Sequence, residues 1–416
     1  MDTEVWIFLA LSLAVSFYLA FNIGANDLAN AMGTSVGSKA LTVKQAVIMA
    51  ALLNLAGAVL VGSRVTETVR SDIIDMDALG GGDTLSWTIL FGMLAAMLSA
   101  AIWITIATYF HLPVSTTHAI VGAIMGFGLA AGGIAVVNWP VMAKISLSWV
   151  VSPIAGAATA FFCFWLIKRV ILTHDQPFKQ TLKYAPWLMG LVFGILAIAM
   201  VIEGLENLHL GFGVFHIILI GIGVGVAAAL PSRWLFKKYE MVEGDEYTKV
   251  ERIFIPLQIC TAGYVAFAHG SNDVANAIGP VTTIVGQLAY GSPGDITRGA
   301  VIGLLLLGGI GIAIGTAIWG RGVMRTIGER ITEITPTRGF TAEFAAATTV
   351  LVCSLLGLPI STTHVLVGAV IGVGIAGGVA AVDANVIKNI VMSWLVTVPV
   401  AAGLCILIFL GMSYIA

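Results

Sequence analysis

The chain has 416 residues, of which 58% are hydrophobic and only 10% are charged, and its formal net charge is −2. Soluble domains carry about 25% charged residues, so this composition excludes an ordinary soluble protein and indicates an integral membrane protein. The near-neutral charge gives no indication of a nucleic-acid partner, and the short alternating segments of an outer-membrane barrel are absent.

Apolar runs recur along the whole chain, and most are long enough for a helix that crosses a hydrocarbon core about 30 Å thick. In chain order, we expect spans at about 5–25, 45–64, 86–109, 112–136, 141–167, 187–204, 210–230, 253–275, 298–319, 341–357, 358–381 and 387–412. The first span has no basic segment or cleavage site before it, so we expect it to be structural and not a signal peptide. The predicted fold is an all-α polytopic membrane protein with about 12 transmembrane segments.

Two pairs of matching motifs indicate an internal duplication. The sequence GANDLANAMG at 24–33 matches GSNDVANAIG at 270–279, and LPVSTTHAIVGAIMG at 112–126 matches LPISTTHVLVGAVIG at 358–372. The members of both pairs are 246 positions apart. Two separate motifs that share one separation indicate two homologous halves.

The duplication divides the chain into a first repeat at 1–168, a two-helix spacer with cytoplasmic loops at 169–251 and a second repeat at 252–416. We predict that the charged stretch 232–252 is a cytoplasmic linker. With the N-terminus outside, the inner side holds all Lys and Arg residues except Arg64, Arg70, Lys144 and Arg298. The second repeat then starts on the opposite side from the first, so the repeats have inverted topology. Such repeats, with broken or re-entrant helices at a central site, are typical of secondary transporters.

Each Asn-Asp motif places one carboxylate between two amides in an apolar segment. On a helix, Asn26 and Asn30 share a face and Asp27 lies beside them. Gly24 and Gly33 bracket the motif, so the helix could break there and expose carbonyl oxygens. Carboxylate, amide and carbonyl oxygens suit a hard cation such as Na⁺. The alternative is a satisfied polar contact between helices. The second copy consists of Asn272, Asp273 and Asn276.

Each Pro-x-Ser-Thr-Thr-His motif predicts a helix start, because Pro113 and Pro359 suit a first helical turn. The hydroxyls that follow are Ser115, Thr116, Thr117, Ser361, Thr362 and Thr363. Free backbone N–H groups and the helix dipole make such a start an anion site. The alternative is simple helix capping. None of the four motifs contains Lys or Arg, so a bound anion would need co-bound cations. A protonated oxyanion could also donate to an aspartate, which favours phosphate over sulfate.

Four further polar residues lie in apolar surroundings. His118 and His364 follow the hydroxyl clusters and could carry protons or simply bond a carbonyl. Glu343 has Met97 as its counterpart 246 positions earlier, and Asn54 is a lone polar residue in the second span. Since a polar group within a span is often functional, Glu343 and Asn54 are candidate cation ligands.

At GANDLANAMGTSVGS, GSNDVANAIGP, LPVSTTH and LPISTTH, the sequence resembles the inorganic phosphate transporter (PiT) family of cation-coupled symporters. The resemblance implies phosphate symport with Na⁺ or H⁺, both chain ends outside the cell, and often a homodimer. It also implies binding roles for Asn26, Asp27, Asn30, Ser115, Thr116, Asn272, Asp273, Asn276, Ser361 and Thr362. Glu343 resembles a functional glutamate of some members, whereas Asn54 stands where animal members carry glutamate.

We therefore predict a sodium-coupled phosphate importer of the cell membrane that works by alternating access and has no organic cofactor and no enzymatic activity. The predicted phosphate ligands are Asn26, Asp27, Ser115, Thr116, Thr117, Asn272, Asp273, Ser361, Thr362 and Thr363. The predicted sodium ligands are Asp27, Asn30, Asp273, Asn276, Ser115, Ser361, Asn54 and Glu343.

Three alternatives stay open. The first is a proton-coupled phosphate or sulfate transporter of the same fold, and the second is a passive anion channel. The third is an intramembrane hydrolase, suggested by GGGD at 80–83 and GTSVG at 33–37. The first of these patterns lies in an acidic loop, and the second lacks the strand-turn-helix context of a nucleophile elbow.

Overall fold

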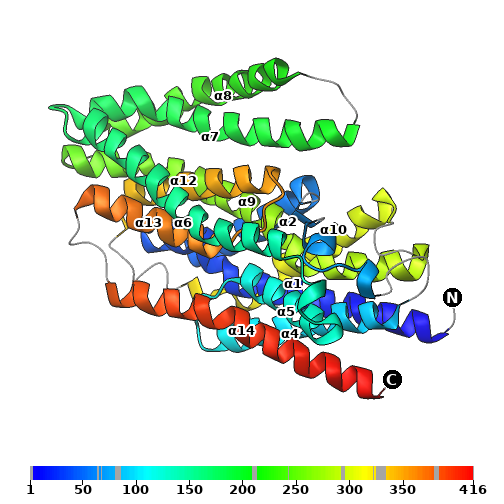
Figure 1. Ribbon diagram of the computed structural model, residues 1–416. Helices are drawn as coiled ribbons and strands as arrows, with labels where there is room; N and C mark the ends of the chain where they lie inside the picture. The colour runs from blue at the N-terminus through cyan, green and yellow to red at the C-terminus, as the bar shows by residue number, and fades with distance from the viewer. Residues whose placement is uncertain are drawn as a thin grey trace.

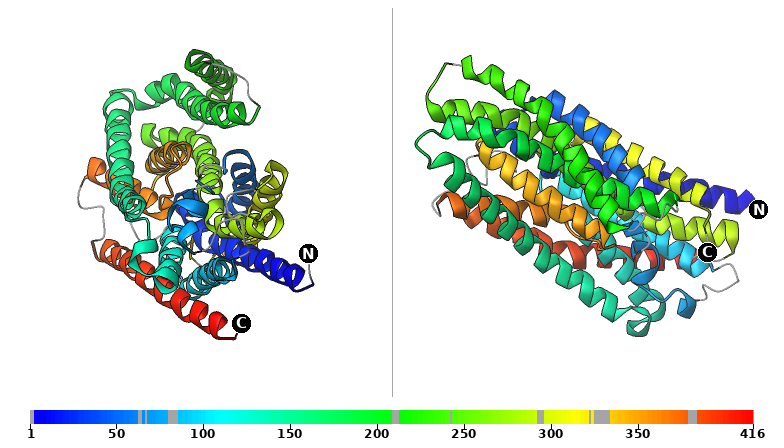
Figure 2. Two further views of the ribbon diagram at one scale, coloured as in Figure 1. Left: turned by 45° about the vertical axis from the view of Figure 1, so that its right-hand side comes forward. Right: turned by 90° about the horizontal axis from the view of Figure 1, so that it is seen from above.

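The computed structural model describes residues 3–62, 65–66, 68–79, 86–208, 213–241, 243–291, 296–321, 323–324, 334–378 and 384–415. Within these ranges the chain forms α-helices and short helical turns, with one isolated bridge between Ile74 and Val137. The helices run side by side in one bundle, and the two chain ends lie at the same end of it (Figure 1; Figure 2). The all-α fold predicted from the sequence is confirmed.

Twelve α-helices make up the described bundle. Their bounds are α1 Thr3–Gly37, α2 Val43–Val61, α4 Trp87–Tyr109, α5 Thr116–Gly132, α6 Trp139–Ile167, α7 Pro177–Leu208, α8 Val214–Lys237, α9 Glu246–Tyr290, α10 Arg298–Trp319, α12 Pro336–Leu355, α13 Thr362–Gly377 and α14 Ala384–Ile415. In the described ranges, nine helices are long and apolar enough to cross a membrane, while α5 and α13 are shorter apolar helices. The chain is therefore a polytopic membrane protein.

Several helices begin at a residue whose side chain caps the first turn. Thr42 and Gln45 form a reciprocal capping box at the start of α2. Asp245 accepts a hydrogen bond from the Thr248 backbone amide at the start of α9. These side chains satisfy amides that have no partner within the helix, so the helix starts are encoded locally.

The expectation that helices break at the Asn-Asp motifs is wrong. Helix α1 continues through Asp27 to Gly37, and α9 continues through Asp273 to Tyr290, well beyond the predicted spans. Gly24, the first of the two glycines that bracket the motif in α1, has a different role. A Cβ at Gly24 would collide with the Ile312 carbonyl of α10, so glycine here permits two backbones to approach.

Two helix crossings of this kind pack the centre of the bundle. At the crossing of α1 and α10, a Cβ at Gly24 would meet the Ile312 carbonyl, and a Cβ at Gly315 would meet the Phe21 carbonyl. The same arrangement occurs between α2 and α9, where the matching pairs are Gly57 with Phe267 and Gly270 with Asn54. Both crossings thus join a helix of the first half to a helix of the second half.

Gly315→Ala should strongly lower the unfolding temperature, because the added carbon would meet the backbone of α1. Overpacking a core costs about 1 to 3 kcal/mol, and a backbone yields less readily than a side chain. Tryptophan fluorescence during heating of the detergent-solubilised protein measures the shift. Gly303→Ala on the same helix is the matched control, since no heavy atom lies within 4 Å of a Cβ at that position. Equal unfolding temperatures for the two variants would contradict the close crossing.

Two helical hairpins, α4–α5 and α12–α13, bring their turns together in the middle of the bundle. Thr117 Oγ1 donates to the Ile360 carbonyl at 2.8 Å, and Thr363 Oγ1 donates to the Val114 carbonyl at 3.4 Å. Each hairpin turn is therefore bonded to the helix that follows the other turn. This contact places the Ser-Thr-Thr motifs of both halves at one location.

The two prolines of these motifs lie outside the helices, contrary to the prediction. Helices α5 and α13 begin at Thr116 and Thr362, after the extended N-cap residues Ser115 and Ser361. The serine side chains cap the first turn by accepting from the His118 and His364 amides, so each helix begins directly after its serine.

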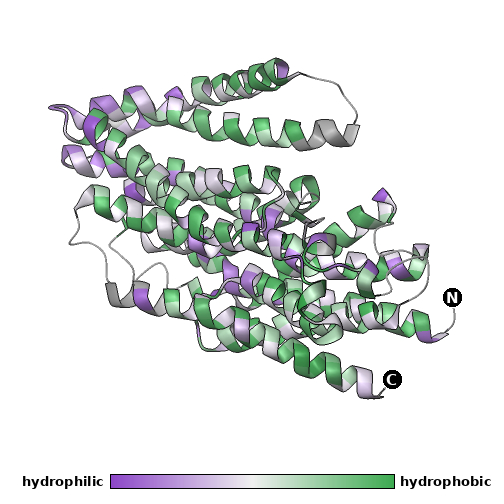
Figure 3. Cartoon of the chain, viewed as in Figure 1, coloured by the Kyte–Doolittle hydropathy of each residue, from purple (hydrophilic) through white to green (hydrophobic). Residues whose placement is uncertain are grey.

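Helices α7 and α8 form a hairpin at the edge of the bundle, where α7 packs against α9 (Figure 1). They approach closely at glycines, with Gly190 against the Gly225 carbonyl and Gly194 against the Gly221 carbonyl. Helix α8 has many large apolar side chains exposed. Hydrophilic residues gather at the end where α7 begins and α8 ends (Figure 3). The predicted linker 232–252 is mostly helical, because α8 continues to Lys237 and α9 begins at Glu246.

Candidate functional site

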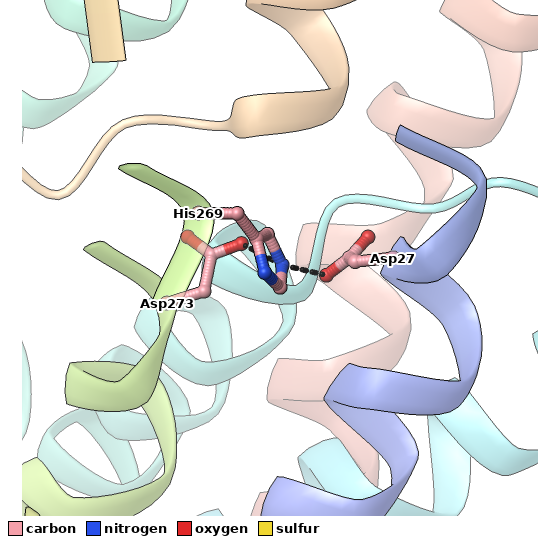
Figure 4. A group of neighbouring side chains, drawn as sticks. All are labelled: Asp27, His269 and Asp273. Carbon is pink, nitrogen blue, oxygen red and sulfur yellow. Dashed lines mark ion pairs between the residues drawn. The ribbon is translucent and has the colours of Figure 1, made fainter. Parts of the chain in front are cut away.

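Two buried carboxylates from the two halves lie close together in the centre of the bundle. Asp27 of α1 and Asp273 of α9 have exposed fractions of 1% and 0%. His269, one turn before Asp273 on α9, lies between them (Figure 4). Its Nε2 atom is 3.0 Å from Asp273 Oδ2 and 3.5 Å from Asp27 Oδ2. One imidazole nitrogen therefore lies within 4 Å of both acids, although it forms no hydrogen bond with the described residues.

Each acid also accepts a hydrogen bond from a helix start of its own half. Thr116 Oγ1 of α5 donates to Asp27 Oδ2 at 3.0 Å. Thr362 Oγ1 of α13 donates to Asp273 Oδ2 at 2.9 Å. The predicted association of the Asn-Asp motif with the Ser-Thr-Thr motif is thus present twice, at the same sequence separation.

The second asparagine of each motif bonds to the opposite half. Asn30 Nδ2 donates to Thr363 Oγ1 at 2.7 Å and to Asp27 Oδ1 at 2.8 Å. Asn276 Nδ2 donates to Thr117 Oγ1 at 3.1 Å. These bonds bring predicted ligands from both halves into one cluster.

The first asparagine of each motif holds a hairpin turn. Asn26 Nδ2 donates to Thr108 Oγ1 at 3.0 Å and to the Leu112 carbonyl at 3.1 Å. Asn272 Nδ2 donates to the Ser354 hydroxyl at 3.1 Å and to the Leu358 carbonyl at 3.2 Å. These contacts fix the hairpins relative to α1 and α9.

The two serines act as helix caps. Ser115 Oγ accepts from the His118 amide at 3.1 Å, and Ser361 Oγ accepts from the His364 amide at 3.3 Å. This is the capping role that the sequence left open. A hydroxyl oxygen has two lone pairs, so each serine retains an acceptor position for a further ligand.

Several buried oxygen atoms in this cluster have no hydrogen-bond donor among the described residues. They are Asn30 Oδ1, Asn272 Oδ1, Asn276 Oδ1 and Asp273 Oδ1. A buried acceptor without a donor carries a desolvation cost of roughly 1 to 3 kcal/mol. A hard cation satisfies such oxygens directly. The central cluster therefore has the chemistry of a cation site.

Glu343 lies in a second cluster and is fully buried, in the second turn of α12. Its Oε1 accepts from Thr34 and Ser35 at 2.6 Å each and from Gln258 Nε2 at 3.2 Å. Its Oε2 accepts from Thr261 at 2.7 Å. Since Thr34 is seven residues beyond Asp27, this cluster lies about 10 Å farther along α1.

Asn54 contacts a histidine that sequence reasoning missed. Its Oδ1 atom lies 2.7 Å from His269 Nδ1, so Asn54 reaches the central acids through the imidazole. A signal for His269 was available, because a histidine four residues before Asp273 shares its helix face. The comparison of the two repeats did not select His269, because its counterpart 246 positions earlier is the apolar residue Ile23.

His118 and His364 pack behind the helix starts. Their ring centroids are 4.4 Å apart. His118 packs against Trp149 at 3.8 Å with the rings tilted, and His364 stacks on Trp394 at 3.5 Å. His364 Nδ1 is also 3.3 Å from the Trp149 carbonyl. This contact is the carbonyl bond that the sequence left open as an alternative to proton transfer.

The two hydrolase patterns receive no support. GTSVG lies within the continuous helix α1, where Thr34 and Ser35 donate to Glu343. The pattern GGGD at 80–83 lies outside the described residues.

Acidic and amide groups enclosed at the centre of an apolar helical bundle are typical of a polytopic membrane transporter. The chain belongs to the phosphate transporter family, since the model of that family matches residues 23–405. As a member of this family, it is a transporter of phosphate.

Individual relatives match over nearly the full length. A protein of Pyrococcus abyssi named "Putative phosphate permease" is 46% identical over 98% of this chain and 98% of its own length. A protein of the same name from Chlamydia trachomatis serovar D is 41% identical, again over 98% of each chain. A solved structure named "The sodium-dependent phosphate transporter" is 41% identical, with a TM-score of 0.92, and covers 99% of this chain and 100% of its own.

Proposed function

We propose that this chain imports inorganic phosphate together with sodium across the cell membrane. The observation that carries this proposal is the group of buried oxygens without donors at Asn30, Asn272, Asn276 and Asp273. Sodium is a hard cation that oxygen atoms bind well. The similar solved structure is that of a transporter named as sodium-dependent, which supports the same conclusion.

The central sodium ligands in this proposal are Asp27, Asn30, Asp273 and Asn276, with the remaining lone pairs of Ser115 and Ser361 close by. Asp27 and Asp273 supply the negative charge and the asparagines supply neutral oxygens. Sodium bound here is cargo that moves with phosphate. Asn54 contributes through His269 and not as a direct ligand.

The phosphate ligands in this proposal are the starts of α5 and α13, with Thr116, Thr117, Thr362 and Thr363 as hydroxyl partners and Asn26 and Asn272 beside them. Helix starts attract anions through free amides and the helix dipole. The motifs contain no Lys or Arg, so sodium must offset the charge of phosphate. Asp27 and Asp273 repel an anion unless a cation is bound, which couples the two cargoes.

Glu343 supplies a further sodium site in this proposal. Its carboxylate faces hydroxyl and amide groups of Thr34, Ser35, Gln258 and Thr261, whose oxygens can turn toward a cation. The counterpart position in the first half is Met97, which is apolar. The additional sodium site therefore has no counterpart in the first repeat.

We also propose alternating access, in which the two hairpin turns and their cargo move relative to the helices that surround them. The inverted repeats, the outside location of both termini and the homodimer stay predictions from the sequence. The shared location of both chain ends is compatible with an even number of crossings (Figure 1).

Uptake of labelled phosphate by proteoliposomes tests this proposal. An inward sodium gradient should drive accumulation above equilibrium, whereas equimolar potassium should not. Uptake that persists without sodium and is abolished by an uncoupler would show that protons, not sodium, are the coupled ion. A phosphate flux that is the same with and without an ion gradient would indicate a channel. Sulfate in excess should not compete with labelled phosphate.

A further inference from the structure

Helices α7 and α8 carry positive charge at one end of their hairpin, where hydrophilic residues gather (Figure 3). The stretches 177–202 and 214–238 hold five basic residues and no acidic residue. The five are Lys179, Lys183, Arg233, Lys237 and Lys238, and all are exposed. None of them forms an ion pair with another described residue. The positive charge of this end is therefore available to an anionic partner.

An aromatic ring, and not a carboxylate, lies beside the arginine of this group. The Arg233 guanidinium of α8 is 5.3 Å from the centre of the Trp187 ring of α7. A guanidinium on a ring face keeps its N–H donors, which lie in its own plane, for oxygen atoms. The carboxylate of Glu246, at the adjoining start of α9, accepts from the Phe178 backbone amide at 3.2 Å instead. The arginine thus retains donors for a phosphate group.

The basic end continues into an aromatic and then an apolar surface. On α7, Lys183, Trp187 and Leu191 follow one another at intervals of four residues and share a helix face. On α8, Leu230 lies three residues before Arg233. Trp187, Leu191 and Leu230 have exposed fractions of 49%, 48% and 50%. Tryptophan concentrates where a membrane meets water. The order of cation, indole and aliphatic side chain matches the order of phosphate, glycerol and acyl chain in a phospholipid.

We infer that Lys183, Trp187, Arg233 and Lys237 bind the headgroup of an anionic phospholipid, whose acyl chains lie along Leu191 and Leu230. Basic residues beside a membrane helix attract anionic lipids, and the buried apolar chain adds to the affinity. Free phosphate has the same charged group but no apolar part, so the adjoining apolar surface favours the lipid. This binding site is separate from the central cluster and does not depend on which ion is coupled to uptake.

Native mass spectrometry of the purified protein with added phosphatidylglycerol or phosphatidylcholine tests the inference. Phosphatidylglycerol should bind more tightly than phosphatidylcholine. The double variant Lys183→Gln with Arg233→Gln should weaken phosphatidylglycerol binding about thirtyfold, and Lys183→Gln alone about fivefold. The matched control is Lys44→Gln with Lys388→Gln, which removes the same charge at two exposed positions of α2 and α14 and should leave the affinity unchanged.

The unfolding temperature in nanodiscs gives a second measurement. Phosphatidylglycerol in the nanodisc should raise it for the unaltered protein and the control, and should raise it less for the double variant. Should the double variant fail to fold, Lys183→Gln alone decides the question.

Three outcomes would overturn the inference. The first is equal phosphatidylglycerol affinity in the double variant and the control. The second is displacement of the bound lipid by inorganic phosphate at constant ionic strength, which would indicate a general phosphate site. The third is an altered oligomeric state of the double variant with unchanged lipid binding, which would assign this surface to a contact between copies of the chain. None of these outcomes involves sodium, so each leaves the proposed function intact.

Discussion

Asp27→Asn and Asp273→Asn should each lower sodium-driven phosphate uptake by about two orders of magnitude, because loss of one buried charged partner costs roughly 3 kcal/mol. Both acids are buried and share the same imidazole, and each accepts a hydroxyl from its own helix start. An amide preserves the shape but removes the charge that attracts sodium. Initial uptake rates in proteoliposomes measure the effect.

Asp77→Asn is the matched control for these variants, because Asp77 is exposed in the loop between α2 and α4. Its uptake should equal that of the unaltered protein. Uptake by both folded variants within about twofold of the unaltered protein would mean that the paired acids have no part in cargo binding, because even 1.4 kcal/mol corresponds to a factor of about ten.

Glu343→Gln should raise the sodium concentration for half-maximal uptake about tenfold, with a smaller change in the phosphate concentration required. The substitution removes a charge that accepts hydrogen bonds from four side chains. The new amide nitrogen cannot accept a hydrogen bond, so the hydroxyls that donate to that atom now must change orientation. Sodium titration of uptake at saturating phosphate measures the change.

Met97→Leu is the control for the glutamate, because Met97 is buried at the equivalent position of α4. It should leave the sodium requirement unaltered. A sodium titration of Glu343→Gln that superimposes on that of the unaltered protein would remove Glu343 from the cation path.

Much of the architecture was predictable because it depends on composition and on local patterns. Low charge and long apolar runs indicate membrane helices directly. Helix ends were predicted less well. The span expected at 253–275 is part of the 45-residue helix α9, since charged residues such as Glu246 continue the helix beyond the apolar run.

The central cluster was predicted through its repetition. Asp27, Asp273 and the Ser-Thr-Thr motifs occur twice at one separation, and the structure brings these residues together. The same comparison passed over His269, Gln258 and Thr261, which occur in one half only. Contacts such as that between Ser35 and Glu343 join residues more than 300 positions apart, and no local pattern reports them.

Reciprocal binding of the two cargoes tests the central claim most directly. If buried acids hold the sodium that in turn holds phosphate, each cargo must increase the affinity for the other. Calorimetric titration of phosphate into the purified protein should show affinity that rises steeply with sodium and is lost in Asp27→Asn. Equal phosphate affinity in sodium and in potassium would contradict this account.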